Sequence, residues 1–266
     1  MSNQHGTVWT KPQISESGTE AGHVSPSKGY YYDFHLHSCL SPCGDNDMTP
    51  NNIVGMASLL GLQIIALTDH NSVKNCRAVC KVGRQNGLVV IPGMELCTAE
   101  EIHVVTLFPD VDSAEAFGAH VSTTLPPIPN RPDIFGEQRI LDENDEIVGL
   151  EEVYLLSASS ISIEEVMPLC GSYGGVCYPA HIDRSSFSVI SALGLFPDHI
   201  GFRFAELSRQ AGPGYASQVQ LPQGLKLLRS SDAHYLEDID EAKYTLPLEN
   251  CTPAAAVKYL ESAPLA

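Results

Sequence analysis

The chain has 266 residues, 43% of them hydrophobic and 18% charged, which is ample for a buried core in one large domain or two small ones. Its 15 Lys and Arg stand against 32 Asp and Glu, and the formal net charge of −17 argues against duplex nucleic acid or an acidic membrane as a partner, because clustered Lys and Arg bind both. A small phosphorylated substrate is not excluded, since bound metal ions would reverse the local field.

Residues 1–28 are rich in Ser, Gly, Thr and Gln and show no apolar periodicity, so we predict a flexible N-terminal tail. Neither a signal-peptide apolar stretch nor a run of ~20 apolar residues occurs, and we therefore expect a cytoplasmic protein. The eight cysteines are scattered without a CxxC pair. Reduced and mostly buried thiols are the simplest interpretation for a chain long enough to form a core.

Residues 29–266 are predicted to form one domain in which short strands alternate with helices. Apolar, β-branched or aromatic runs indicate seven strands, within residues 30–35, 63–70, 88–96, 102–108, 174–181, 200–208 and 225–234. Helices are predicted within residues 49–61, 73–85 and 252–262, the last with Thr252 as its N-cap. This alternation favours an α/β fold with a largely parallel sheet, while periodicity alone does not establish closure into a barrel.

One long segment, about residues 110–161, interrupts the alternation and is predicted to be an insertion. It contains PPIPNRP and RILDENDEIVG, in which DEND between apolar flanks predicts a hairpin turn. Because segments of this length are commonly lids or binding loops, we predict a flap beside the functional site. Gln138 or Arg139 could contact substrate there, and a plain surface position for both is the competing interpretation.

Five histidines follow the ends of predicted strands, namely His35, His37, His70, His181 and His234. Four carboxylates lie one or two residues from them, namely Asp33, Asp69, Asp183 and Asp232. In parallel α/β folds, ligands and metals bind at the carboxyl ends of the strands. A single histidine there is more often structural, but five in the same topological position indicate a site.

The spacing of these residues suits metal binding. In an extended HxH segment, His35 and His37 point to the same side, so both imidazoles can reach one ion. Imidazoles together with carboxylates suit Zn, Mn or Fe, and there are more candidate ligands than one tetrahedral ion needs. The sequence therefore predicts a cluster of two or three divalent ions.

Taken together, the motifs resemble the PHP (polymerase and histidinol phosphatase) superfamily of metal-dependent phosphoesterases. The matching segments, in the family's order, are DFHLHS at 33–38, LTDHN at 67–71, GMEL at 93–96 followed by IHVV, PAH at 179–181 and SSDAH at 230–234. The resemblance implies a distorted seven-stranded (β/α) barrel with a metal cluster at the carboxyl ends of the strands. It also implies phosphoester hydrolysis by metal-activated water.

The resemblance also implies a ligand set. The first metal would be held by His35, His37, Glu95 and Asp232. Glu95 would bridge to a second metal, which His103 and His181 complete. His70 and His234, with an acid from the first loop, would hold a third. Asp69 would orient its neighbours by accepting hydrogen bonds.

Two departures from the family pattern bear on the site. The family usually has Ser-Asp-Gly shortly after HxHS, whereas SCLSPCGDND here moves the acid to Asp45 or Asp47. We predict Asp45 as the ligand, with Asp47 or a cysteine of this loop as the alternatives. In PAHIDR, the family often has Pro after the histidine, which is absent here. Arg184 follows the histidine closely enough to clamp a phosphate, and an ordinary surface charge is the equally weighted alternative.

We therefore predict an enzyme, a metal-dependent phosphoric ester hydrolase for small phosphomonoesters or phosphodiesters, with nucleotides among the candidates. Asp69 and Arg184 are the predicted catalytic residues besides the ligands. The alternative is a metal-binding regulatory or ligand-binding module with little turnover, and amidohydrolase chemistry ranks last. We expect a small phosphorylated substrate as partner, with no duplex nucleic acid and no membrane. The sequence leaves the oligomeric state open.

Overall fold

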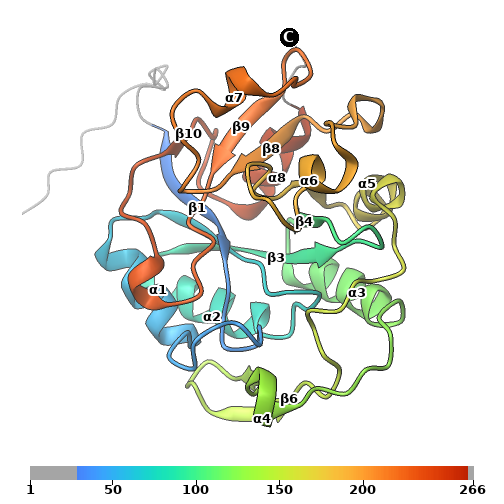
Figure 1. The fold of residues 1–266 in the computed structure, drawn as a ribbon. Coiled ribbons are helices and arrows are strands. Elements are labelled where there is room, and N and C mark those ends of the chain that lie inside the picture. The colour runs from blue at the N-terminus through green and yellow to red at the C-terminus, as the bar shows by residue number, and fades with distance from the viewer. Residues whose placement is uncertain (1–28, 263–266) are drawn as a thin grey trace, which may run out of the picture.

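The computed structural model describes residues 29–262, so the predicted tail at residues 1–28 lies outside the described residues. A six-stranded sheet has the order β10-β1-β2-β3-β4-β7 and curls into a half-barrel (Figure 1). Its strands are β1 Tyr30–Leu36, β2 Ile64–Leu67, β3 Val89–Cys97, β4 His103–Leu107, β7 Val176–Pro179 and β10 Thr245–Leu246. Two further pairs are β5 Arg139–Leu141 with β6 Ile147–Leu150, and β8 Phe204–Leu207 with β9 Lys226–Arg229.

The α/β fold class predicted from the sequence is confirmed, but the strands are less parallel than expected. β1, β2 and β3 run parallel, as do β8 and β9, whereas β4 is antiparallel to both β3 and β7. Cys97 pairs with His103, so only a short loop joins β3 to β4. A parallel crossover needs a dozen residues or more, and the short loop therefore forces a hairpin.

The helices are α1 Pro50–Leu59, α2 Cys76–Asn86, α3 Val111–Ser122, α4 Pro132–Phe135, α5 Ile163–Ser172, α6 Val189–Leu193, α7 Tyr215–Gln218 and α8 Pro253–Ser262. Two short 3-10 turns are η1 Asp198–Ile200 and η2 Leu236–Asp238. As predicted, the Thr252 hydroxyl accepts a hydrogen bond from the Ala255 amide at 3.2 Å and so caps α8. Among the described residues, no helix is long and apolar enough to cross a membrane.

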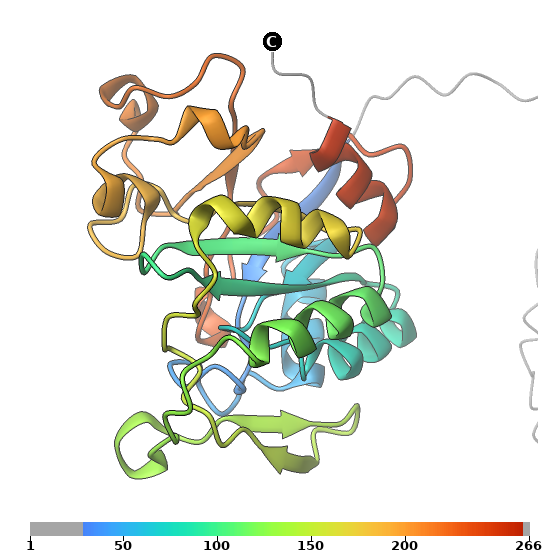
Figure 2. The same cartoon turned by 90° about the vertical axis from the view of Figure 1, so that its right-hand side faces the viewer.

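Alternating side chains place apolar groups on both faces of the sheet. Along β2, Ile65 and Leu67 pack into the cluster that α1, α2 and α3 share. Ile64 and Ala66 face the other way, into a cluster with Val257 and Leu260 of α8. Figure 2 shows α2 and α3 together on one side of β3 and α8 across the sheet from them, while the buried residues of α5 belong to the same cluster as those of α1, α2 and α3. Both faces of the sheet are therefore buried, and its strand ends are left for the site.

The first part of the predicted insertion belongs to the body of the domain. Phe117 of α3 packs on Phe108, with ring centroids 4.9 Å apart, and both side chains are fully buried. A Cβ on Gly118 of α3 would lie 2.6 Å from a Val73 methyl, which shows how closely α3 approaches the segment before α2. Only the part after α3 leaves the body, and it forms the β5–β6 hairpin that projects from one end of the molecule (Figure 2).

The β5–β6 hairpin has the predicted turn and packs against the first loop. The Asp142 carboxylate accepts the Asn144 and Glu146 amides at 2.8 and 3.0 Å, which closes the DEND turn. The Arg139 amide donates to the Cys39 carbonyl at 3.0 Å, and so joins β5 to the loop that follows β1. Within the described residues, the buried Gln138 side chain hydrogen-bonds to the backbone of residues 151–155 alone, so it is not placed to contact substrate.

Candidate metal centre

Eight of the nine predicted metal ligands meet at one edge of the sheet. They come from the ends of β1, β2, β3, β7 and β9 and from the start of β4, and they are His35, His37, His70, Glu95, His103, His181, Asp232 and His234. His103 joins them because β4 runs antiparallel to β3, so its first residue lies beside the last residues of the parallel strands. Left-handed backbone at His181 (φ 27°) and Asp232 (φ 53°) turns the chain sharply at both positions.

The Glu95 carboxylate is the centre of this cluster. It is 1% exposed and lies within 3.5 Å of five imidazole nitrogens. The distances are 2.9 Å to His103 and to His70, 3.0 Å to His181, 3.2 Å to His35 and 3.5 Å to His37. Burial alone would raise the pKa of Glu95, but His103, His35 and His70 hold it well below its usual range. The carboxylate is therefore ionised and can serve as a bridging anion.

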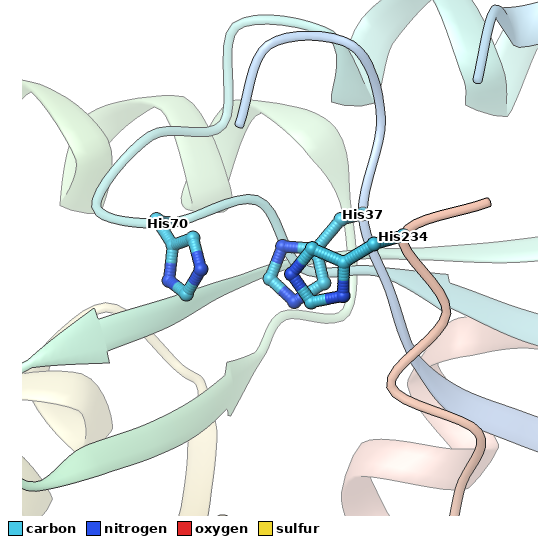
Figure 3. A group of neighbouring side chains, drawn as sticks. All are labelled: His37, His70 and His234. Carbon is cyan, nitrogen blue, oxygen red and sulfur yellow. The ribbon is translucent and has the colours of Figure 1, made fainter. Parts of the chain in front are cut away.

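Three overlapping groups of ligand atoms each lie within 4.8 Å of one another in the described residues. They are His35, His37, Glu95 and Asp232; His70, Glu95 and His103; and His37, His70 and His234. The last group contains three imidazoles: the rings of His37 and His234 stack, with centroids 4.1 Å apart, and His70 lies to one side of them (Figure 3). Glu95 belongs to the first two groups, which is the arrangement expected of a carboxylate between two ions.

Hydrogen bonds on the outer ring nitrogens determine which nitrogen is free for metal. The Ser41 hydroxyl donates to Asp69 at 2.8 Å, so it can accept from Nδ1–H of His37 at 3.0 Å. His234 likewise directs Nδ1 at the Asp232 carbonyl, 2.9 Å away. In both residues Nε2 is left for an ion. Because His37 has a single free nitrogen, it can serve the first group or the third, but not both.

Unsatisfied buried atoms show that this donor set suits a metal. His35 Nε2, His70 Nδ1 and Glu95 Oε2 are buried and make no hydrogen bond of acceptable geometry. Leaving such atoms unpaired is costly, and coordination to a divalent ion would satisfy all three. Burial and neighbouring imidazoles lower the pKa of His37, and burial lowers that of His70. A lowered pKa favours the neutral imidazole, which is the form that binds metals.

Comparison with known proteins agrees with this geometry. The sequence model described as PHP domain matches residues 33–171. The chain belongs to the PHP domain family. An uncharacterised protein of Methanocaldococcus jannaschii is 30% identical over 88 residues, which cover 30% of this chain and 51% of that protein. The chain thus has the fold of PHP-family metal-dependent hydrolases, and it spans about half the length of this curated relative.

Solved structures share the PHP fold at low sequence identity. A lesion-specific endonuclease from Pyrococcus furiosus aligns with a TM-score of 0.63 at 18% identity, covering 88% of this chain and 56% of the endonuclease. A protein from Bifidobacterium adolescentis, described as a metal-dependent phosphoesterase, aligns with a TM-score of 0.54 at 18% identity over 88% of this chain and 96% of its own. These alignments show the fold of the PHP domain beyond the residues that the sequence model matches.

One structural neighbour corrects the expectation that excluded duplex nucleic acid. Endonuclease Q in complex with a 27-mer duplex, with an abasic lesion at its active site, aligns with a TM-score of 0.61 at 16% identity over 88% of this chain. The exclusion, which we based on a net charge of −17, was therefore wrong. Net charge is a sum over the chain, whereas phosphate binding depends on the local field at a site, which bound cations can reverse.

Asp69 lies behind the cluster of eight predicted ligands, which we call the PHP centre, rather than in it. Its carboxylate accepts the Ser38 amide at 2.7 Å, the Ser38 hydroxyl at 2.6 Å and the Ser41 hydroxyl at 2.8 Å. It thereby ties the first loop to the end of β2, and through Ser41 it orients His37. This geometry agrees with the orienting role predicted for Asp69, which stays a prediction.

Sequence inspection missed Glu206, a fully buried carboxylate at the end of β8. Its Oε1 lies 2.8 Å from Nδ1 of His35 and accepts the His181 amide at 3.3 Å. A carboxylate on the outer nitrogen of a ligating histidine fixes the ring and makes it a stronger ligand. The available signal was its position at the end of an apolar strand, but no histidine stands beside it in the sequence.

The first loop does not place Asp45 in any of the three ligand groups of the described residues. The Asp45 carboxylate instead accepts the Asp47 amide at 2.8 Å, while the Asp45 amide donates to the His234 carbonyl at 2.9 Å. Burial raises the pKa of Cys39 to about 12, which disfavours a thiolate ligand at that residue. Completion of a third site by Asp45, Asp47 or a cysteine stays a prediction.

Arg184 lies at the rim of the PHP centre. Its Nη2 atom is 2.7 Å from Oδ2 of Asp232, and 44% of its side chain is exposed. The guanidinium therefore touches a predicted metal ligand on one side and faces solvent on the other. Such a group can donate to an anion at the rim while it stays anchored, because guanidinium presents five donors in a fixed plane.

Proposed function

We propose that this protein is a metal-dependent phosphoesterase for small phosphomonoesters or phosphodiesters. The observation that carries the proposal is the Glu95 carboxylate, which lies among five imidazoles and is shared by two groups of ligands. Such a set suits two ions a few ångströms apart, a common arrangement in phosphatases and nucleases. Arg184 adds a cation beside it that fits a phosphoryl group.

The chain's own residues have distinct tasks in this proposal. His35, His37, Glu95 and Asp232 would hold one ion, and His70, His103 and His181 would hold another together with Glu95. Bound divalent ions polarise phosphoryl oxygens and lower the pKa of water from 15.7 to about 7. Glu206 and Asp69 orient the ligands, and Arg184 binds and orients the phosphate. A side-chain nucleophile is not required.

A nucleic acid is the second candidate substrate. The complex of endonuclease Q shows a duplex with an abasic lesion at the active site of a protein that shares this fold. The same ligand set would cleave a phosphodiester in either kind of molecule, so the chemistry is common to both candidates. The two candidate substrates would make different contacts with the surface around the PHP centre, so a panel that contains both kinds would distinguish them.

Metal content and phosphate release test the proposal together. We expect about two transition-metal ions per chain, because the donor set exceeds what one tetrahedral ion needs. Removing them with a chelator should abolish phosphate release, and adding Mn, Zn or Fe should restore it. The panel should contain sugar phosphates, nucleotides, a phosphodiester and a duplex with an abasic site, with elemental analysis alongside. A protein that binds no metal would contradict the site, and a loaded protein that cleaves nothing would indicate a binding module.

Replacing Arg184 by Ala should weaken phosphate binding but leave the ions in place. A charge-assisted hydrogen bond contributes about 1.5–3 kcal/mol, so KM for a phosphomonoester should rise roughly ten- to hundredfold. Arg184→Lys keeps the charge without the planar donor pair, so its KM should lie between those of wild type and Arg184→Ala. Arg209, which pairs with Asp238 on a neighbouring loop, offers a matched control in Arg209→Ala. Loss of metal in Arg184→Ala would mean that the arginine supports Asp232 rather than the substrate.

A further inference from the structure

The loop that follows β7 presents an aromatic ring at the rim of the PHP centre. Phe187 is 44% exposed, although a large apolar side chain is normally buried. Its ring stacks on the imidazole of His103, with centroids 4.7 Å apart and planes at 23°. His103 in turn lies 2.9 Å from the Glu95 carboxylate. One imidazole therefore separates the Phe187 ring from the centre of the cluster.

The backbone holds Phe187 in place at a cost in conformational energy. Its φ of 53° lies in the left-handed region, which a residue with a bulky side chain rarely adopts. The Phe187 carbonyl accepts the His103 amide at 2.9 Å, and the Ser188 hydroxyl donates to the Arg184 carbonyl at 2.7 Å. Ser188 also caps α6 through the Ser191 amide. The loop is thus fixed between β4 and α6 while the ring remains at the surface.

The same loop carries a cation and an aromatic surface three residues apart. Arg184 contacts the Asp232 carboxylate of the cluster, and Phe187, whose ring stacks on His103, offers an exposed apolar surface on the same loop. Stacking on His103 uses one face of the Phe187 ring, and 44% of the residue remains exposed. A phosphoester that also carries an aromatic ring would use both groups, because bases stack well on Phe.

We propose that Phe187 is a specificity-determining residue that stacks on the base of a nucleoside phosphate whose phosphate binds at Arg184 and the metal cluster. This inference rests on the proposed function and names its substrate class. A sugar phosphate would bind through its phosphate alone and leave the ring exposed. The substrate preference of the protein therefore depends on the loop after β7 as well as on the ligands.

The test compares two substrates that differ only in the base, adenosine 5′-monophosphate and ribose 5-phosphate, on the metal-loaded protein. In Phe187→Ala, KM for the nucleotide should rise roughly 5- to 150-fold, the effect of removing one base–aromatic stack, while KM for ribose 5-phosphate stays within about twofold. Phe187→Trp should retain the preference. Leu195, 64% exposed beyond α6, gives the control Leu195→Ala, which removes an exposed apolar side chain away from the cluster.

Equilibrium binding of the non-hydrolysable phosphonate analogues of both compounds provides a readout that does not depend on turnover. Wild type should prefer the base-containing analogue, and Phe187→Ala should lose that preference with its metal content unchanged. Equal losses for both ligands, or loss of metal, would overturn the inference and show that Phe187 only supports His103. Hydrolysis of ribose 5-phosphate without any effect of the base would refute this inference and leave the proposed function standing. Absence of phosphate release from every ester would refute the proposed function instead.

Discussion

Asp232→Asn is expected to lower kcat/KM by at least ~1,000-fold. Mutating a residue that hydrogen-bonds a metal ligand typically lowers activity or metal affinity about 10–100-fold, and loss of a ligand itself should have a larger effect. The Asp232 carboxylate lies 3.2 Å from His37 Nε2 and 3.4 Å from His35 Nε2. Although burial opposes ionisation, His35 and His37 hold the pKa of Asp232 below its usual range. Asparagine keeps the shape but removes the charge from this group of ligands. Elemental analysis should show about one ion fewer per chain.

The control for this change is Asp198→Asn, which removes an exposed carboxylate on η1 outside the ligand groups of the described residues. It should leave metal content and turnover as in wild type. Circular dichroism and thermal unfolding should establish that Asp232→Asn is folded. Persistent phosphate release from a folded, metal-deficient Asp232→Asn would contradict the proposed mechanism. A wild-type protein that binds phosphate esters without cleaving them, and still does so after the change, would indicate the binding module.

The sequence was most informative where chemistry and strand ends coincide. His35 and His37 share an HxH motif, whose spacing along an extended chain points both rings to the same side, and His70 and His234 follow the ends of other predicted strands. The seven predicted strands are all present for a related reason, since apolar β-branched runs are local features. Long-range relations were harder to predict. His35 and Glu206 are 171 residues apart, and no local pattern joins them.

Two features of the fold were missed although signals for them were present. The segment between Cys97 and His103 is too short for a crossover, which would have predicted the β3–β4 hairpin. Ala114, Phe117 and Val121 recur at helical spacing and are buried in α3, yet they were assigned to the insertion. The Asp45 carboxylate shows a different limit. Its hydrogen bond with the Asp47 amide is a local feature that a motif does not show, and its role as a ligand stays a prediction.

Glu95→Gln should have a larger effect on metal content than Asp232→Asn. Glu95 belongs to two of the ligand groups, whereas Asp232 belongs to one. A glutamine would present an amide to imidazole nitrogens that now lie 2.9–3.2 Å from a carboxylate, at His103, His70, His181 and His35. Both ions should therefore be lost, and turnover should fall at least as far as in Asp232→Asn.

Glu95→Asp tests how the length of this side chain affects metal binding while the negative charge is kept. It keeps the anion but shortens the side chain by one methylene, so we expect it to retain part of the metal and a small part of the activity. Elemental analysis should give wild type, Asp232→Asn and Glu95→Gln in descending order of ions per chain. Equal metal loss in Asp232→Asn and Glu95→Gln would show that the ions bind as one inseparable unit. Retention of both ions in Glu95→Gln would disprove the bridging role of this carboxylate, because no other carboxylate belongs to two of the ligand groups in the described residues.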